Sequence, residues 1–219
     1  MLIDVLHRTG LIAILRGVAS AEVAEIGAVV FAAGIRIIEV PLGSPDALAS
    51  IRILRAGLPP DCVVGAGTVT SPAQVEDVRQ VGGELIVMPH SDPEVIRAAR
   101  AAHLAVAPGV ATPTEAFAAL AAGADVLKMF PAELLGPAVV KAWRVVLPAG
   151  TPLVPVGGIT PEKLAGFVAA GATGVGLGSA LYPPGASASD VAARASAFVD
   201  AWRAARADTI DRAPPKTER

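Results

Sequence analysis

The chain has one cysteine, few aromatic residues and almost no net charge, and each shortage removes a class of protein. Cys62 is the only cysteine in 219 residues, so neither an intrachain disulfide nor a metal site of paired cysteines can form. Aromatic residues make up 4% of the chain and the formal net charge is -2, which leaves little for base stacking and no broad positive field. We therefore expect no nucleic-acid partner and a cytoplasmic location.

Long uncharged runs are also scarce, and one stretch alone resembles a membrane span. No charged residue occurs between Lys163 and Asp190, but repeated glycines and the pair Pro183 and Pro184 interrupt this stretch. The first ten residues lack the basic segment and apolar run of a signal peptide. We expect no membrane partner.

The chain is rich in apolar residues, at 53%, and these occur in short runs that alternate with longer amphipathic segments. The runs are dominated by valine, isoleucine and leucine, as in parallel strands covered on both faces. Eight such units in one chain predict a single-domain (β/α)8 barrel of parallel strands over residues 1–205, with an open doubly wound sheet as the weaker alternative. Residues 206–219 are polar and are expected to form a mobile tail. The expected strands are 11–17, 35–42, 62–69, 84–90, 104–110, 125–131, 152–158 and 174–181.

Helix boundaries are marked by capping residues and glycines. A capping residue next to a proline suits the first turn of a helix, and a glycine suits a left-handed C-terminal cap. The expected N-terminal caps are Ser44, Ser71, either Ser91 or Asp92, Thr112 and Thr160, and the expected glycine ends are Gly34, Gly82, Gly123 and Gly171.

Lys128 lies inside the apolar sixth strand, where alternation places it on one face with Val126 and Phe130. Burial disfavours a charged amine, and a neutral amine is a nucleophile that attacks ketones and forms an iminium electron sink. Lys141 and Lys163 fall on expected helices, so Lys128 is the candidate nucleophile. The alternative is a lysine that reaches out to solvent or forms an ion pair without chemistry.

Two further charged residues end expected strands in phase with inward apolar residues. Glu39 shares a face with Ile35 and Ile37 and could act as a general acid and base, or it could only neutralise Arg16 or Lys128. Arg16 is positioned to bind a carboxylate or phosphate, or to pair with Glu39.

The loops after the last two strands are typical of phosphate sites in such barrels, because glycines allow backbone N–H groups to approach an anion. The candidates are Gly157, Gly158, Gly178 and Ser179. Thr68 could bind a substrate carboxylate or cap the next helix. His90 is expected to be a solvated loop residue, and no residues have metal-ligand spacing, so we expect neither a metal nor an organic cofactor.

Several motifs, taken in chain order, resemble the class I aldolases that act on 2-keto-3-deoxy-6-phosphogluconate and 2-keto-3-deoxy-6-phosphogalactonate. The resemblance implies that Lys128 forms the Schiff base and Glu39 is the general acid and base. It implies that Thr68 and Pro89 surround the pyruvyl group and that Phe130 lies beside the lysine. It also implies phosphate binding by the glycine loops, no cofactor and a homotrimer. The matching motifs are IAILRG (12–17), IIEVPLGSP (37–45), VGAGTV (64–69), LIVMPH (85–90), APGVATPTEA (107–116), LKMFPAE (127–133), VPVGGITPE (154–162) and GLGSALY (176–182).

Departures from the gluconate type favour the galactonate branch. Gly43 stands where gluconate-type members carry an arginine, Arg16 occurs in a galactonate-type motif, and Val156 replaces a threonine. We therefore expect cleavage of 2-dehydro-3-deoxy-6-phosphogalactonate to pyruvate and D-glyceraldehyde 3-phosphate, with Arg16 and Val156 contacting the substrate. The alternatives are the gluconate epimer or both epimers, a phosphosugar isomerase or epimerase, and a non-catalytic barrel that binds a phosphorylated metabolite.

Overall fold

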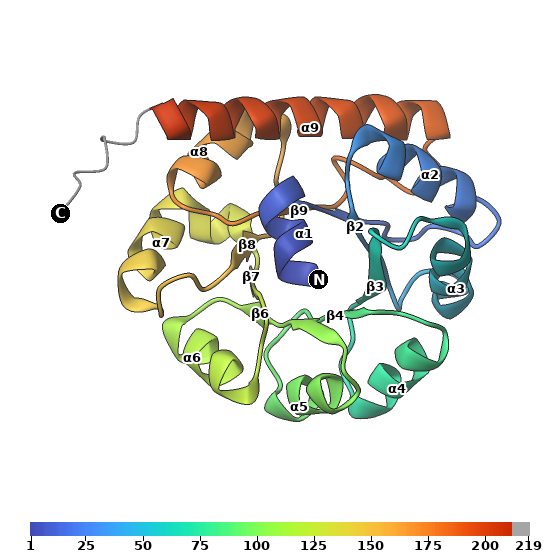
Figure 1. Ribbon diagram of the computed structural model, residues 1–219, viewed down its shortest axis with the longest axis horizontal. Coiled ribbons are helices and arrows are strands. Elements are labelled where there is room, and N and C mark those ends of the chain that lie inside the picture. The colour runs from blue at the N-terminus through green and yellow to red at the C-terminus, as the bar shows by residue number, and fades with distance from the viewer. Residues whose placement is uncertain (212–219) are drawn as a thin grey trace.

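The strands of the molecule curl around a common interior and the helices cover their outer side. The computed structural model describes residues 1–211, and Figure 1 shows α2 to α9 outside the strands. Every strand pair is parallel, as expected for alternating strands and helices. The prediction of an α/β fold with parallel strands is confirmed.

Each expected strand is present but shorter than predicted, because the predicted ranges also took in the loops that follow the strands. The structure has β1 (Leu11–Ile14), β2 (Ile37–Pro41), β3 (Val63–Gly67), β4 (Leu85–Val87), β5 (Ala105–Ala107), β6 (Gly109–Val110), β7 (Leu127–Met129), β8 (Leu153–Pro155) and β9 (Val175–Leu177).

The strands form two sheets, with the order β5-β4-β3-β2-β1-β9 in one and β6-β7-β8 in the other. The fifth expected strand is divided at Pro108, which has no backbone N–H to donate. Its carbonyl still accepts from Lys128 N at 3.0 Å, and Val126 N donates to Val106 O at 3.3 Å. On the other side, a parallel bridge joins Val156, just after β8, to Gly176 of β9. The sheets therefore meet through short contacts rather than one continuous ladder.

Most predicted helix boundaries agree with the structure. Ser71 and Asp92 accept backbone N–H bonds as N-terminal caps, and Thr112 forms a reciprocal capping box with Glu115. The helical elements are α1 (Leu2–Thr9), α2 (Val23–Ala33), α3 (Ala47–Gly57), α4 (Pro72–Gln80), α5 (Pro93–Ala101), α6 (Pro113–Ala122), α7 (Ala132–Val146), the 3₁₀ turn η1 (Pro161–Lys163), α8 (Leu164–Ala169) and α9 (Ala188–Asp211).

The predicted cap at Ser44 is wrong. Helix α3 begins after Asp46, and the buried Ser44 hydroxyl instead accepts from Gly17 N at 2.8 Å. Ser44 thus ties the start of the loop after β2 to the loop after β1. Thr160 precedes a 3₁₀ turn and its side chain makes no capping bond there.

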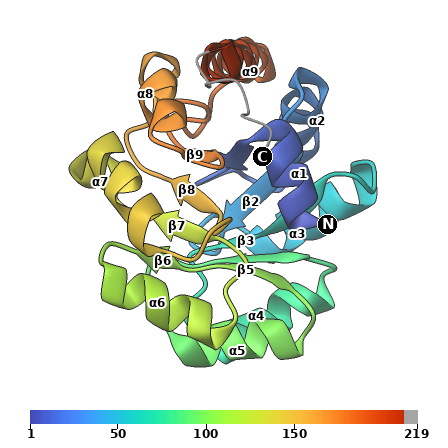
Figure 2. The ribbon, with the colours of Figure 1, turned by 60° about the vertical axis from the view of Figure 1, so that its left-hand side comes forward.

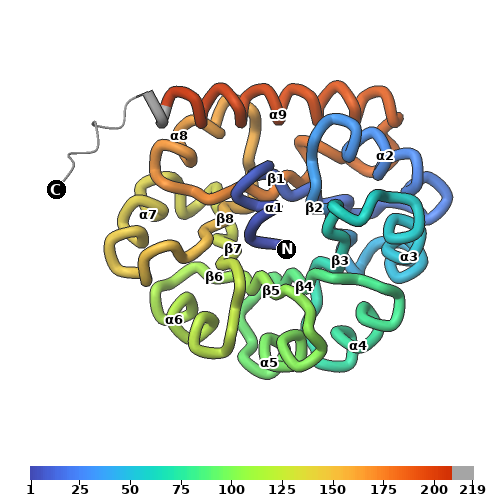
Figure 3. The backbone as a smooth tube through the Cα atoms, in the orientation of Figure 1, coloured from blue at the N-terminus to red at the C-terminus, as the bar shows by residue number. Residues whose placement is uncertain are grey.

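Helix α1 was not predicted from the sequence, where the first ten residues were noted only for lacking the features of a signal peptide. Figures 2 and 3 show it lying across the interior of the strands. Its buried Leu2, Val5 and Leu6 pack with inward residues of the strands in one cluster, which also includes Ile37 and Val126. The helix therefore closes the end of the strands at which the chain enters them.

Side chains of alternate strand residues face two different cores. Leu127 and Met129 belong to the larger core between strands and helices, whereas Ile12 and Ile14 belong to the inner cluster. Ile35 is an exception to the prediction, because it lies before β2 and packs in the outer core.

Helix α9 is longer than expected and crosses the molecule beside α2 and α8 (Figure 1). It continues to Asp211, so residues 206–211 of the predicted tail are helical. The rest of that tail, 212–219, lies outside the described residues. Within residues 1–211, no helix combines the length and apolar character required to cross a membrane.

Leu6→Ala tests whether α1 closes the interior. Leu6 is fully buried, so its truncation should lower the free energy of unfolding by about 2–5 kcal/mol. Arg8→Ala, at an exposed position of the same helix, should cost no more than about 1 kcal/mol. Urea unfolding curves measure both, and equal midpoints for the two variants would contradict the role assigned to α1.

Candidate active site

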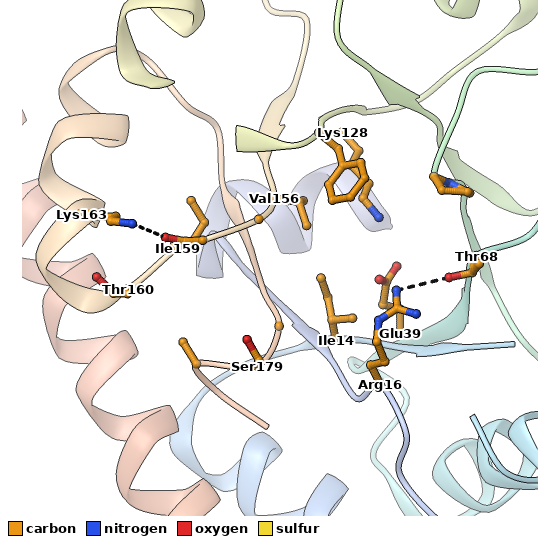
Figure 4. A pocket seen from close by; sticks show the side chains of 16 residues that line it. Ile14, Arg16, Glu39, Thr68, Lys128, Val156, Ile159, Thr160, Lys163 and Ser179 are labelled. Atoms are coloured by element: carbon orange, nitrogen blue, oxygen red, sulfur yellow. Dashed lines mark hydrogen bonds between the residues drawn. The ribbon is translucent and has the colours of Figure 1, made fainter. Parts of the chain in front are cut away.

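A cavity of about 450 Å³ opens where the strands end and the loops begin. Every site residue predicted from the sequence lines it, so the structure brings the whole predicted set together (Figure 4). The predicted residues in its wall are Arg16, Glu39, Thr68, Pro89, Lys128, Phe130, Val156, Gly157, Gly158, Gly178 and Ser179.

Lys128 projects into this cavity from the middle of β7, where its backbone pairs with Gly109 and Val154. Its side chain is only 7% exposed, so the alternative of a lysine reaching out to solvent is wrong. The amine lies 5.4 Å from the centre of the Phe130 ring. Among residues 1–208, no carboxylate forms an ion-pair contact with it. Lys128 is thus a buried amine facing a substrate-sized space.

Glu39 points into the same space from β2 and is 1% exposed. Its Oε2 atom has no hydrogen-bond partner among the described residues. Loss of hydration raises the pKa of Glu39, while the charges of Lys128 and Arg16 act in the opposite direction. A carboxyl whose pKa is raised holds its proton more tightly than an exposed carboxyl does, which suits a general acid.

Glycine at position 67 makes room for this carboxyl group. A Cβ atom at Gly67 would lie 3.0 Å from Cδ and Oε1 of Glu39. In the sequence, Gly67 occurs only within the motif VGAGTV (64–69), and the need for space at this position follows from Glu39 on the neighbouring strand.

A smaller cavity of about 10 Å³ lies deeper and is lined by both Glu39 and Lys128. Its other walls are apolar, including Val87, Val126 and Val154. This volume is on the order of one water molecule. Glu39 and Lys128 are the charged residues in the wall of this otherwise apolar space.

Arg16 and Thr68 lie together on the Glu39 side of the cavity (Figure 4). The Arg16 guanidinium donates to Thr68 Oγ1 at 3.4 Å. Thr68 has φ of 59°, a left-handed conformation that a β-branched residue rarely adopts and that costs about 1–3 kcal/mol. Since Ser71 caps α4, the alternative role of Thr68 as the helix cap is wrong. The pair presents donors suited to a carboxylate.

The two glycine loops form the other side of the cavity. Gly157 and Gly158 have positive φ, at 109° and 64°, which glycine adopts without strain. Gly178 and Ser179 follow β9, and the Val156–Gly176 bridge holds the two loops next to each other. This side offers neutral donors to an anion.

Five residues of the cavity wall were missed: Ile14, Ile159, Thr160, Lys163 and Ala180. Lys163 had been assigned to a helix away from the site, but it ends a short 3₁₀ turn that immediately follows the glycine loop. Lys163 follows Pro161 by two residues, so the sequence already places it directly after the glycine loop.

Other reactive residues lie elsewhere. His90 is exposed and is not part of the cavity wall, as expected. Cys62 is fully buried, and burial raises the pKa of its thiol to about 11, which suits a core residue. Among residues 1–208, no group of three or more His, Cys, Asp or Glu side chains is placed to hold a metal ion.

Glu39→Gln tests the electrostatic environment of the site. A raised pKa means that the folded state holds the proton more tightly than the unfolded state, so wild-type stability falls as pH rises above the unfolded value near 4.5. The variant should therefore match the wild type near pH 4 and be more stable at pH 7, by urea unfolding. Glu25→Gln, on the exposed side of α2, is the control. A stability difference that does not change with pH would refute the assignment.

The comparisons with known proteins point to one family. Residues 2–196 match the family model "KDPG and KHG aldolase". A probable 2-dehydro-3-deoxy-6-phosphogalactonate aldolase of Rhizobium meliloti (strain 1021) is 46% identical over 194 residues, which cover 89% of this chain and 92% of the relative. The 2-dehydro-3-deoxy-6-phosphogalactonate aldolase of Escherichia coli (strain K12) is 46% identical, covering 89% of this chain and 95% of the relative. A solved structure described as native KDPGal superposes with a TM-score of 0.89 at 45% identity, covering 90% of this chain and 96% of that one. The chain belongs to the KDPG and KHG aldolase family.

Proposed function

We propose that this aldolase cleaves 2-dehydro-3-deoxy-6-phosphogalactonate to pyruvate and D-glyceraldehyde 3-phosphate through a Schiff base on Lys128. One observation carries the proposal: a buried amine and a buried carboxyl with a free oxygen line the same cavity. The names of the two 46% identical relatives support the galactonate substrate. The apolar Val156 at the position of a threonine in gluconate-type enzymes supports it as well.

The first half of the reaction forms an iminium. The Lys128 amine attacks the C2 ketone, and Glu39, through one water in the inner cavity, supplies the proton with which the C2 hydroxyl leaves as water. Arg16 and Thr68 hold the C1 carboxylate, since their donors lie on the same side of the cavity as Glu39. Pro89 and Phe130 exclude water around the pyruvyl group.

The second half breaks the carbon–carbon bond. Glu39 accepts the C4 hydroxyl proton, the C3–C4 electron pair moves into the iminium, and the aldehyde leaves. The enamine then takes a proton at C3, and water hydrolyses the resulting iminium to release pyruvate and the free amine. The Gly157–Gly158 and Gly178–Ser179 loops hold the phosphate throughout. All of these steps use side chains of this chain together with water.

We further propose that the two sheets act as one closed (β/α)8 barrel, formed by a single domain that extends through α9. The backbone hydrogen bonds around Pro108 and the Val156–Gly176 bridge support closure. A homotrimer is proposed from the family, and it offers cover for apolar side chains that the single chain exposes. These are Phe117, Leu134, Val145 and Val146.

Borohydride reduction in the presence of pyruvate tests the Schiff base. A stable adduct should appear on the peptide that contains Lys128, since the enzyme–pyruvate iminium forms in the reverse direction. Lys141→Ala should be trapped as well as the wild type, and Lys128→Ala should not be trapped. Glu39→Gln keeps the amine and should be trapped more slowly, by roughly 10²–10⁴-fold. Mass spectrometry locates the adduct, and a wild-type enzyme without one would refute the mechanism.

Isomerised product without pyruvate would favour the isomerase alternative, and binding without turnover would favour the non-catalytic one.

Val156→Thr tests the choice of epimer. The wild type should favour the galactonate configuration, and a hydroxyl at this position should shift the ratio of kcat/KM toward the gluconate configuration by roughly tenfold. Val156→Ala removes methyl groups without adding a hydroxyl and should leave the ratio nearly unchanged. Parallel pyruvate assays on the two epimers give the ratio. Equal ratios in the wild type and Val156→Thr would exclude Val156 as the discriminating residue.

A further inference from the structure

Lys163 is an unassigned cation in the wall of the active-site cavity. It ends the turn that follows the Gly157–Gly158 loop, and its Nζ donates to Gly158 O at 2.7 Å. Its side chain is exposed, so the ammonium stays in contact with solvent at the open side of the cavity. The sequence analysis expected no role for it.

The cavity holds its charges in two separate groups. Arg16 and Lys128 lie around Glu39, whereas Lys163 lies on the opposite side near Thr160 and Ser179 (Figure 4). Among the described residues of the cavity wall, Lys163 is therefore the cation of the phosphate side. The glycine loops there supply neutral N–H groups and one hydroxyl, whereas a phosphate monoester brings about -1.5 to -2 charges at pH 7.

Two carboxylates lie close to this side without lining the active-site cavity, because Glu133, Glu162 and Lys163 line a neighbouring cavity of about 360 Å³. Glu133 lies against the loop, since a Cβ atom at Gly158 would be 2.6 Å from its Oε2. Glu162 is adjacent to Lys163 in the turn. Hydrogen bonds from Thr160 and from its own backbone lower the pKa of Glu162, and the Lys163 charge adds a smaller effect in the same direction. Both carboxylates repel a phosphate, and Lys163 opposes that repulsion.

The present hydrogen bond of Lys163 suits a phosphate ligand. An ammonium group has three donors, and the Gly158 carbonyl uses one of them. The bond ties the ammonium to the same loop whose backbone N–H groups face the cavity. Two donors of the ammonium therefore remain for an anion.

We propose that Lys163 binds the substrate phosphate and makes the enzyme selective for phosphorylated over unphosphorylated keto acids. This inference rests on the proposed function for the reaction itself, and it adds a residue that binds the charged phosphate. Because the phosphate lies far from the C3–C4 bond, Lys163 contributes mainly to binding and little to the chemical step.

Lys163→Gln removes the charge and keeps a polar side chain. For the phosphorylated substrate, kcat/KM should fall about tenfold, mostly through KM, which corresponds to about 1.4 kcal/mol. For the unphosphorylated keto acid of the same configuration, kcat/KM should change by less than about twofold. Lys141→Gln makes the same change in charge on the exposed side of α7 and should behave as the wild type with both substrates. Lys163→Arg should retain most of the preference for the phosphorylated substrate.

Inorganic phosphate gives a readout that does not depend on turnover. Its dissociation constant, measured by calorimetry, should rise in Lys163→Gln and not in Lys141→Gln, with thermal melting as the check that both variants fold. Unchanged phosphate affinity together with an unchanged substrate preference in Lys163→Gln would overturn the inference. A wild type that binds phosphate through Lys163 but yields no pyruvate would instead refute the proposed aldolase reaction alone.

Discussion

The site depends on two ionisable groups being held in an apolar interior without touching each other. Lys128 and Glu39 are 7% and 1% exposed, and the inner residues around them are aliphatic. Such an environment raises the energy of any charge, and the pKa of Glu39 is accordingly raised chiefly by loss of hydration. A direct ion pair would relieve this cost and would also lower the reactivity of both groups. The two residues project from β2 and β7 of different sheets, and among residues 1–208 no ion pair joins them.

The same separation organises the substrate. The side of the cavity with Arg16 and Thr68 suits a carboxylate, and the side with the glycine loops suits a phosphate, so a substrate with an anion at each end has one orientation. That orientation brings the ketone, which is next to the carboxylate, to Lys128 on the side of Arg16 and Glu39 (Figure 4). Binding at both ends can therefore position the reacting carbon without any contact to it beyond the amine and Glu39.

Alternation along the strands was sufficient to predict Lys128, Glu39 and Arg16, whereas the glycine loops were predicted from their place after the last two strands. A strand has a strict two-residue period, so an inward Val126 implies an inward Lys128, and Ile12 and Ile14 imply an inward Arg16. The two-residue period does not predict contacts between segments that are distant in the sequence. The fit of Gly67 against Glu39, the bond from Gly17 to Ser44 and the position of Lys163 each depend on which segments meet in space. Helix α1 was missed because a short amphipathic segment at a chain start resembles an unstructured end.

The distribution of stability along the strands follows from the chemistry. Two features at the carboxyl ends of the strands lower the stability of the fold: the unpartnered Oε2 of Glu39 and the left-handed conformation of Thr68. At their amino ends Leu2 and Leu6 of α1 pack in the apolar inner cluster. A reactive site that is open to substrate cannot be filled with side chains, so the interior must be packed from the other end. Helix α1 closes one end of the interior and the active-site cavity opens at the other, so that Lys128 is buried and still accessible to substrate.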